Sequence, residues 1–131
     1  MTIVVTAAVI ERDGSFLVTR RQAGVHLEGR WEFPGGKCEP GETLIESLRR
    51  ELREELAVDA DVEDEVFSTT HAYADRIVEL HFFRCRLRGA PSPQLNQDMR
   101  WVGRDELDRL DFPPADAELI DRLRRGEGVQ R

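Results

Sequence analysis

Three glutamates near the middle of the chain have the type and spacing of ligands for a hard metal ion. Glu51, Glu54 and Glu55 lie within five positions, and spacings of three and four residues make side chains neighbours on a helix. Like charges at these spacings destabilise a helix by roughly 0.2–0.5 kcal/mol per pair, so a bound cation would account for them. Ligation by oxygen alone suits Mg²⁺, with Mn²⁺ as a substitute, together with the phosphates of a substrate. The segment therefore predicts a metal-dependent site for phosphate chemistry.

The helix that must carry these glutamates is predicted from the residues around them. Thr43 followed three residues later by Glu46 is a capping-box pattern, which places the first helical residue at Leu44. Five apolar side chains then recur on one face at 100° per residue, so this face is expected to enter the core. They are Leu44, Ile45, Leu48, Leu52 and Leu56. Glu51 and Glu55 lie along the edge of the apolar face, which predicts that they sit beside a cleft.

Length, charge and cysteine content limit the class of protein. With 131 residues the chain is predicted to be one domain, residues 1–131, with a frayed tail from about residue 126. A net charge of −7 argues against nucleic acid or a membrane surface as a partner. The two cysteines lack metal-site or redox spacing, and neither a signal peptide nor an apolar run of about 20 residues is found. These features predict a cytoplasmic protein that is a monomer or a small homo-oligomer.

Short β-rich runs and turn residues outline the remaining elements. The dipeptide Asp13-Gly14 predicts a hairpin turn between the first two runs. The predicted strands are 3–10, 16–19, 66–73, 77–87 and 100–102. A helical turn is expected at 104–110, and Asp116 is expected to cap a final helix. Strands on both sides of a buried helix, with a second helix near the end, predict an α/β (α+β) fold with a mixed β-sheet between helices.

The segment from Gly36 to Val58 resembles the box shared by the Nudix hydrolases. That box has the form G-x5-E-x7-R-E-U-x-E-E-x-G-U, where U is a bulky aliphatic residue. Every position fits except Ala57, which stands where the family has glycine. A solvated helix laced with Glu–Arg pairs would explain the charges, but it would not explain the loop before them. The resemblance covers nearly the whole chain and implies the Nudix α/β/α sandwich.

Within that family the chain resembles the small nucleoside triphosphate pyrophosphohydrolases. These include the MutT-type enzymes, which remove 8-oxo-dGTP from the nucleotide pool, and enzymes that act on CTP and its modified forms. The resemblance rests on the segments 19–21, 31–37, 50–56 and 112–116. It implies Mg²⁺-dependent hydrolysis of a small-molecule nucleoside triphosphate to the monophosphate and pyrophosphate. Oxidised purine nucleotides are the favoured substrates, with cytidine nucleotides as the alternative.

The resemblance also implies a role for individual residues. The metal ligands are expected to be Gly35 and Gly36 through the backbone, and Glu51, Glu54 and Glu55 through their side chains. Glu51 or Glu54 would take the proton of the attacking water, which makes these two the expected catalytic residues. Glu42 and Arg50 are expected to brace the loop against the helix through a salt bridge. The implied substrate-binding residues are Arg21, His26, Glu32, Phe33, Tyr73 and Asp116.

Some of these positions have plainer interpretations, and one position departs from the family. Phe33 and Tyr73 are equally well explained as core aromatics, and Asp116 as the helix cap. Leu95 stands where close relatives carry a further glutamate as metal ligand or base. Gln97 or Asp98 would have to take the role of that glutamate. The base and the number of metals are therefore left open. A non-catalytic nucleotide-binding Nudix domain, or a hydrolase for another nucleotide diphosphate, remains an alternative.

Overall fold

The computed structural model describes residues 1–21, 29–95 and 97–126, and its mixed α and β content agrees with the predicted fold class. The strands are β1 (Thr2–Val9), β2 (Glu11–Arg12), β3 (Ser15–Arg20), β4 (Trp31–Glu32), β5 (Gly35–Lys37), β6 (Ala60–Ala72), β7 (Ile77–Leu87) and β8 (Met99–Gly103). The helices are α1 (Leu44–Leu56), the 3₁₀ helices η1 (Arg104–Arg109) and η2 (Pro114–Asp116), and α2 (Ala117–Arg124). None of the helices in these three stretches is long and apolar enough to cross a bilayer.

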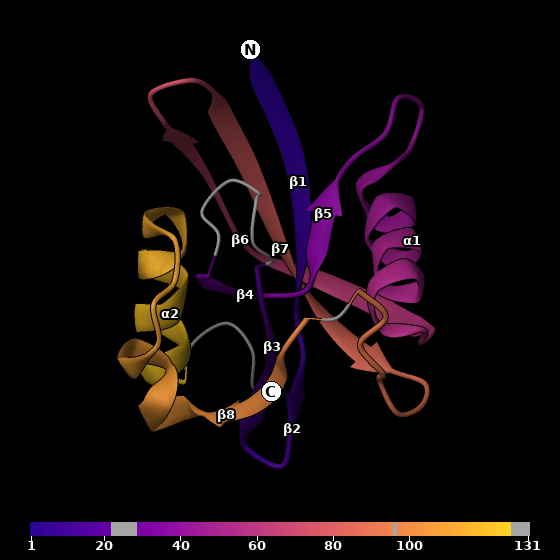
Figure 1. Cartoon of the computed structure of the whole chain (residues 1–131), viewed down its shortest axis with the longest axis vertical. Coiled ribbons are helices and arrows are strands. Elements are labelled where there is room, and N and C mark those ends of the chain that lie inside the picture. The colour runs from indigo at the N-terminus through magenta and orange to yellow at the C-terminus, as the bar shows by residue number, and fades with distance from the viewer. Residues whose placement is uncertain (22–28, 96, 127–131) are drawn as a thin grey trace.

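Two β-sheets form the centre of the molecule. The larger has the order β5–β1–β7–β6, with β1 parallel to β7 and the other neighbours antiparallel, so it is mixed as predicted. In the smaller sheet, β3 pairs antiparallel with β2, β4 and β8. Figure 1 shows β1 running down through the molecule into the hairpin of β2 and β3, which begins the smaller sheet.

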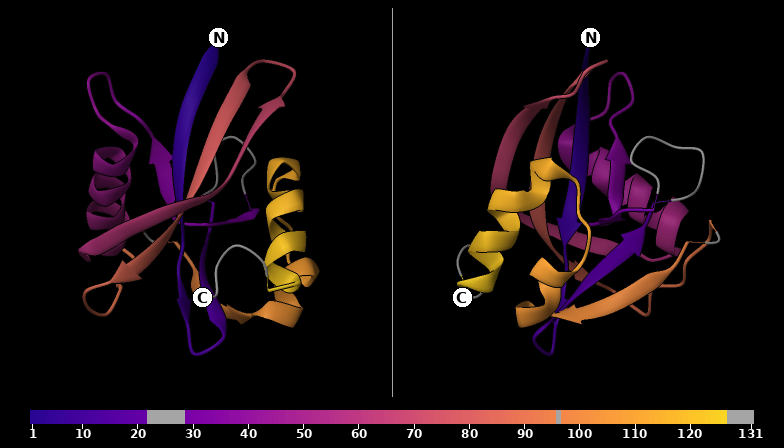
Figure 2. Two further views of the ribbon diagram at one scale, coloured as in Figure 1. Left: turned by 180° about the vertical axis from the view of Figure 1, so that it is seen from behind. Right: turned by 60° about the vertical axis from the view of Figure 1, so that its left-hand side comes forward.

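The two α-helices cover opposite sides of these strands, as Figures 1 and 2 show. On one side, Leu48, Leu52 and Leu56 of α1 are fully buried in a cluster with apolar residues of β1, β3 and β7. On the other side, Leu119 and Leu123 of α2 pack in a second cluster that is rich in phenylalanine. Strands lie between two helical layers, so the predicted α/β/α arrangement is confirmed.

Helix α1 begins where the sequence predicts, and its apolar face is confirmed except in the first turn. Thr43 Oγ1 accepts a hydrogen bond from the Glu46 N–H, and the Glu46 carboxylate accepts one from the Thr43 N–H. The expected burial is wrong for Ile45, which is 44% exposed, and Leu44 is only half buried. The first turn therefore extends beyond the part of the helix that packs on the strands.

All five predicted strands are present, within one or two residues of the predicted ends except at the start of β6, whereas the short strands β2, β4 and β5 were not predicted. The hairpin turn is confirmed, because Asp13 and Gly14 both have positive φ, at 53° and 80°. Strand β6 begins at Ala60 rather than at residue 66. Register shifts on either side of Glu65 interrupt the alternation of its side chains. Because of the acidic run 63–65 and these shifts, the first half of the strand lacks the alternation of apolar and polar residues that predicts a strand.

The prediction that the Asp116 side chain caps the last helix is wrong. Residues 104–109 form the expected helical turn, η1, but η2 leads directly into α2. Asp116 precedes α2 with φ −90° and ψ −6°, and its side chain makes no capping hydrogen bond. The Ala117 N–H instead bonds to the Pro114 carbonyl oxygen. The carboxyl of Asp116 is therefore available for another role.

Ala57 has the left-handed backbone that the family's glycine implies, with φ 52° and ψ 41°. Residues with a Cβ atom are about 1 kcal/mol less favourable than glycine in this conformation. We therefore expect Ala57→Gly to raise the free energy of unfolding by up to about 1 kcal/mol in urea denaturation, with turnover unchanged. The control is Ala117→Gly, where φ −58° and ψ −44° are helical and glycine should destabilise. A lower stability in Ala57→Gly would contradict this reading.

Candidate active site

Two consecutive glycines bring β5 close to helix α1 and to strand β1. A Cβ atom added at Gly36 would lie 2.4 Å from Oε2 of Glu51. One added at Gly35 would lie 2.7 Å from the Cα of Ala7 on β1. A side chain at Gly35 would clash with the backbone of β1, and a side chain at Gly36 would displace the Glu51 carboxyl. The glycines therefore allow the Glu51 carboxyl to lie directly beside the backbone of β5.

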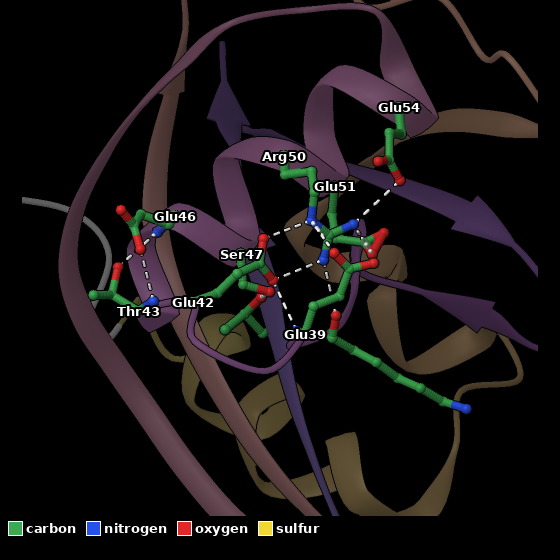
Figure 3. A network of polar contacts seen from close by, with 10 residues as sticks. Glu39, Glu42, Thr43, Glu46, Ser47, Arg50, Glu51 and Glu54 are labelled. Carbon is green, nitrogen blue, oxygen red and sulfur yellow. Dashed lines mark hydrogen bonds and ion pairs between the residues drawn. The ribbon is translucent and has the colours of Figure 1, made fainter.

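Arg50 is the centre of a polar network that joins α1 to the loop before it (Figure 3). Its guanidinium donates to both carboxylate oxygens of Glu42, at 2.7 and 3.0 Å, and to the Lys37 carbonyl oxygen at 3.1 Å. The expected salt bridge between Glu42 and Arg50 is therefore present. The hydrogen bond from Arg50 lowers the pKa of Glu42 to about 2, so this carboxyl is ionised at neutral pH. A bidentate pair of this kind fixes the loop relative to the helix.

Two of the three carboxylates predicted as metal ligands bond to the same arginine. Nη1 of Arg50 lies 3.3 Å from the Glu51 carboxylate and 3.2 Å from that of Glu54. The Glu51 side chain is largely buried, whereas that of Glu54 is 59% exposed. Burial raises the pKa of Glu51, Arg50 acts against this shift, and the charge of Glu54 adds to it. Arg50 thus partly neutralises two carboxylates that repel each other.

Glu55 lies deeper, on the side of α1 that faces β3. Its carboxyl is buried, and Oε1 accepts a hydrogen bond of 3.1 Å from the Thr19 hydroxyl. Burial raises the pKa of Glu55 to about 8, and the charge of Glu32 contributes to the rise. This acid therefore holds its proton at neutral pH unless a cation approaches it.

The chemistry of these donors fits a divalent cation, although the side chains do not form a closed cage. In the part of the chain that the structure describes, no three His, Cys, Asp or Glu side chains are close enough to hold a metal ion. Burial, together with the charge of neighbouring acids, raises the pKa values of Glu51 and Glu55. A bound hard cation would offset both the burial of these carboxylates and their repulsion by neighbouring acids. Carboxylate oxygens are also the ligands that such a cation prefers. Which of the predicted groups bind it stays a prediction.

A pocket of about 530 Å³ extends from β5 across β1 and β7 to η2. Gly35, Gly36 and Lys37 line it where the box begins. All the predicted substrate-binding residues that the structure describes also line this pocket: Arg21, Glu32, Phe33, Tyr73 and Asp116. His26 lies outside the described residues. Side chains from five separate segments of the chain thus meet in one cavity beside the candidate metal site.

Charged groups inside the pocket influence one another. Arg21 and Glu32 form an ion pair at 2.9 Å, so Glu32 orients the guanidinium within the cavity. Burial raises the pKa of Glu32, and Arg21 acts against this shift. Asp116 is only 5% exposed, and its burial, with the charge of Glu32, raises its pKa to about 7. Near neutral pH, Asp116 can therefore present either a protonated or an ionised carboxyl to a ligand.

The aromatic residues of the pocket serve the core as well. Phe33 is buried, stacks on Phe112 at 5.4 Å between ring centroids, and meets Phe82 edge-on at 6.0 Å. It is therefore both a core aromatic and a wall of the pocket. Tyr73 is half buried, with its ring 4.6 Å from that of His71. Its ring reaches the pocket from the end of β6.

Sequence reasoning missed the part of the wall that β7 and the turn before it supply. Arg76, Val78, Leu80 and Phe82 line the pocket. Three of them alternate along β7, which places their side chains on one face of the strand. That alternation was visible in the sequence, but nothing local marked this face as part of a binding site.

Comparison with known proteins agrees with this geometry. The family model of the NUDIX domain matches residues 5–122, which include the box and every pocket residue discussed above. The chain belongs to the NUDIX family. The CTP pyrophosphohydrolase of Escherichia coli (strain K12) is 38% identical over 118 residues, which are 89% of this chain and 87% of that protein. The 8-oxo-dGTP diphosphatase of the same strain is 33% identical over 114 residues, which are 86% of this chain and 88% of that protein.

The NUDIX fold is confirmed by solved structures as well. The solution structure of the E. coli ORF135 protein matches with a TM-score of 0.84 and 36% identity. The match covers 98% of this chain and 95% of that chain. The predicted α/β/α sandwich therefore describes the chain over nearly its whole length.

Within this NUDIX domain, the two polar residues proposed to replace the missing glutamate, Gln97 and Asp98, have other partners in the described part of the loop before β8. Leu95 is 47% exposed. Asp98 pairs with Arg20 at 3.6 Å, and Nε2 of Gln97 donates to the Arg20 carbonyl oxygen at 3.3 Å. Oε1 of Gln97 is buried without a hydrogen-bond partner. Both polar side chains therefore contact β3 in this structure, and the identity of the catalytic base stays a prediction.

Proposed function

We propose that this chain hydrolyses nucleoside triphosphates to the monophosphate and pyrophosphate with Mg²⁺, and that it prefers oxidised purine nucleotides such as 8-oxo-dGTP. One observation carries the proposal. A single pocket is lined by strand β5, which lies beside the glutamates of α1, and also by the buried Asp116. A nucleotide has the same two parts, a polyphosphate that needs cations and a base that offers hydrogen-bonding edges.

The box side of the pocket suits the polyphosphate. The ammonium group of Lys37 is exposed there and would attract the phosphates in a chain of net charge −7. Glu51, Glu54, Glu55 and the backbone of the Gly35–Gly36 turn would hold Mg²⁺, for which Mn²⁺ can substitute. When bound, the cation neutralises phosphate charge and lowers the pKa of a water molecule. Glu51 or Glu54 accepts the proton of the attacking water.

The other side of the pocket suits the base. Asp116 and the Arg21–Glu32 pair offer hydrogen-bonding groups to its edge, while Phe33 and Tyr73 offer aromatic surface to its faces. A protonated Asp116 can donate to a carbonyl such as O6 of 8-oxoguanine, and an ionised one can accept from an amino group. Its pKa of about 7 makes both states accessible near neutral pH.

Hydrolysis of CTP or of modified cytidine triphosphates is the second candidate. The ionised Asp116 favours it, because cytosine presents an amino group to an acceptor. The two E. coli relatives named above carry one activity each, which supports both candidates. We propose further that the chain is a single domain, a cytoplasmic monomer or small homo-oligomer, with neither nucleic acid nor membrane as partner. Its net charge of −7 supports the last two points.

A substrate panel separates these possibilities. Pyrophosphate release would be measured with normal and oxidised purine and pyrimidine nucleoside triphosphates, with and without Mg²⁺. We expect the highest kcat/KM for an oxidised purine nucleotide, cytidine nucleotides next, and no release without a divalent cation. Nucleotide binding without hydrolysis would indicate the non-catalytic alternative. Cleavage confined to sugar nucleotides or dinucleotides would show that the chain acts on another class of diphosphate.

A further inference from the structure

Thr19 lies outside the predicted site, yet its hydroxyl is directed at a predicted metal ligand. The residue belongs to β3, and its side chain is fully buried. Its Oγ1 donates a hydrogen bond of 3.1 Å to Oε1 of Glu55 on α1. Leaving a buried polar group without a partner costs about 1–3 kcal/mol, so each of these two groups restrains the other. The bond therefore fixes the orientation of the Glu55 carboxyl.

The position of Thr19 within the sheet makes this restraint rigid. Strand β3 is the middle strand of its sheet, and Thr19 is paired with Glu32 on β4 and with Met99 on β8. The preceding residues of β3, Leu17 and Val18, are buried and apolar. Valine has nearly the shape of threonine and suits a buried strand well. Packing alone therefore does not account for a hydroxyl at this position.

We infer that Thr19 is a positioning residue for the metal ligand Glu55, an inference that rests on the proposed function. Its hydrogen bond holds Oε1 and so sets the plane of the carboxyl. The Gly35 backbone also hydrogen-bonds this carboxyl, and the oxygen lone pairs that neither bond uses are left to bind a cation. Hydrogen-bond partners that orient ligating carboxylates typically contribute about 10–100-fold to metal affinity or activity. Thr19 thus acts on the metal site without contacting the substrate.

Thr6 offers a matched control for this role. It is also fully buried, and its hydroxyl lies 3.5 Å from the hydroxyl of Ser47 on α1. Thr6 and Thr19 therefore both link a strand to α1, but Thr6 does so through a serine and Thr19 through a carboxyl. Replacing each by valine removes one buried hydroxyl. The comparison separates the general cost of that loss from an effect on ligand orientation.

Binding of Mn²⁺ to the nucleotide-free protein, followed by electron paramagnetic resonance of the free ion, tests the inference. We expect Thr19→Val to weaken Mn²⁺ binding about 10–100-fold. Thr19→Ser keeps the hydroxyl and should recover most of the wild-type affinity, while Thr6→Val should bind Mn²⁺ as the wild type does. In hydrolysis assays, Thr19→Val should approach the wild-type kcat as Mg²⁺ is raised, because the defect lies in metal affinity.

Equal Mn²⁺ affinity in Thr19→Val and the wild type would overturn the inference, and so would an equal loss in Thr6→Val. If Thr19→Val does not fold, Thr19→Ala is the second variant without a hydroxyl, and it is compared with Thr19→Ser in the same way. A wild-type protein that neither binds Mn²⁺ nor releases pyrophosphate would instead contradict the proposed function. The two failures are therefore distinguishable.

Discussion

Replacing Glu54 or Glu55 by glutamine is expected to reduce turnover with Mg²⁺ by about 100-fold or more, while the protein stays folded. Glutamine has nearly the shape of glutamate, but it lacks the negative charge that a cation requires. Steady-state kinetics on the best substrate of the panel gives the measurement. Glu51→Gln should behave in the same way, because its carboxyl lies between Arg50 and the box glycines.

Glu118→Gln is the matched control for these variants. Glu118 lies on α2 and is 64% exposed, and it pairs with Arg122 one helical turn away, as Glu54 pairs with Arg50. The same chemical change at Glu118 should leave turnover unchanged, since an exposed pair of this kind contributes little to stability. Near-normal turnover in both Glu54→Gln and Glu55→Gln would show that this group of carboxylates is not the metal site.

The thermal stability of the metal-free variants shows whether each glutamate lowers the free energy of unfolding. Burial raises the pKa of Glu55 from 4.5 to about 8, so the folded state binds this proton more tightly than the unfolded state does. The free energy of unfolding therefore falls as the pH rises from about 4.5 towards 8, and Glu55→Gln removes this fall. The melting temperature of Glu55→Gln should accordingly gain on the wild type as the pH rises. Glu54→Gln should be nearly neutral, because Glu54 is exposed and paired with Arg50.

Features with a local cause could be predicted from the sequence. The capping box of Thr43 and Glu46 and the turn at Asp13-Gly14 depend on neighbours within a few residues, and the structure contains both. The salt bridge between Glu42 and Arg50 spans a short loop and helix start, and it is also present. The left-handed backbone of Ala57 is also present, but only the family resemblance implied it, because the family has glycine at this position.

Features that depend on how distant segments meet could not be derived from residue patterns. Arg21 and Asp116 are about 95 positions apart in the sequence, yet both line one pocket, and only the family resemblance linked them. Asp116 had the local pattern of a helix cap. In the structure its side chain is buried at the end of η2 and makes no capping hydrogen bond. The sequence pattern around Thr19 indicates only an ordinary residue of a buried strand. Its partner Glu55 becomes visible only when β3 packs against α1.

The buried carboxyl of Asp116 is expected to decide base choice. Asp116→Ala should raise KM for the preferred nucleotide and flatten discrimination among bases, with a smaller loss in kcat than in the glutamate variants. The physical reason is that a site built to hydrogen-bond a base edge rejects bases that leave its buried polar group unpaired. The substrate panel, repeated on Asp116→Ala, measures the change. Unchanged selectivity with only a loss of stability would mean that Asp116 has no role in recognition.

Selectivity should also depend on pH in the wild type and not in Asp116→Asn. With a pKa of about 7, Asp116 is protonated below that pH and can donate to a carbonyl such as O6 of 8-oxoguanine. Above it, the ionised carboxyl only accepts, which favours bases that present an amino group, such as cytosine. Asparagine offers a donor and an acceptor at every pH, so the ratio of kcat/KM for 8-oxo-dGTP to that for CTP should stay constant in Asp116→Asn. In the wild type this ratio should fall as the pH rises through about 7, and a ratio that rises instead would contradict the assignment of Asp116 to the base.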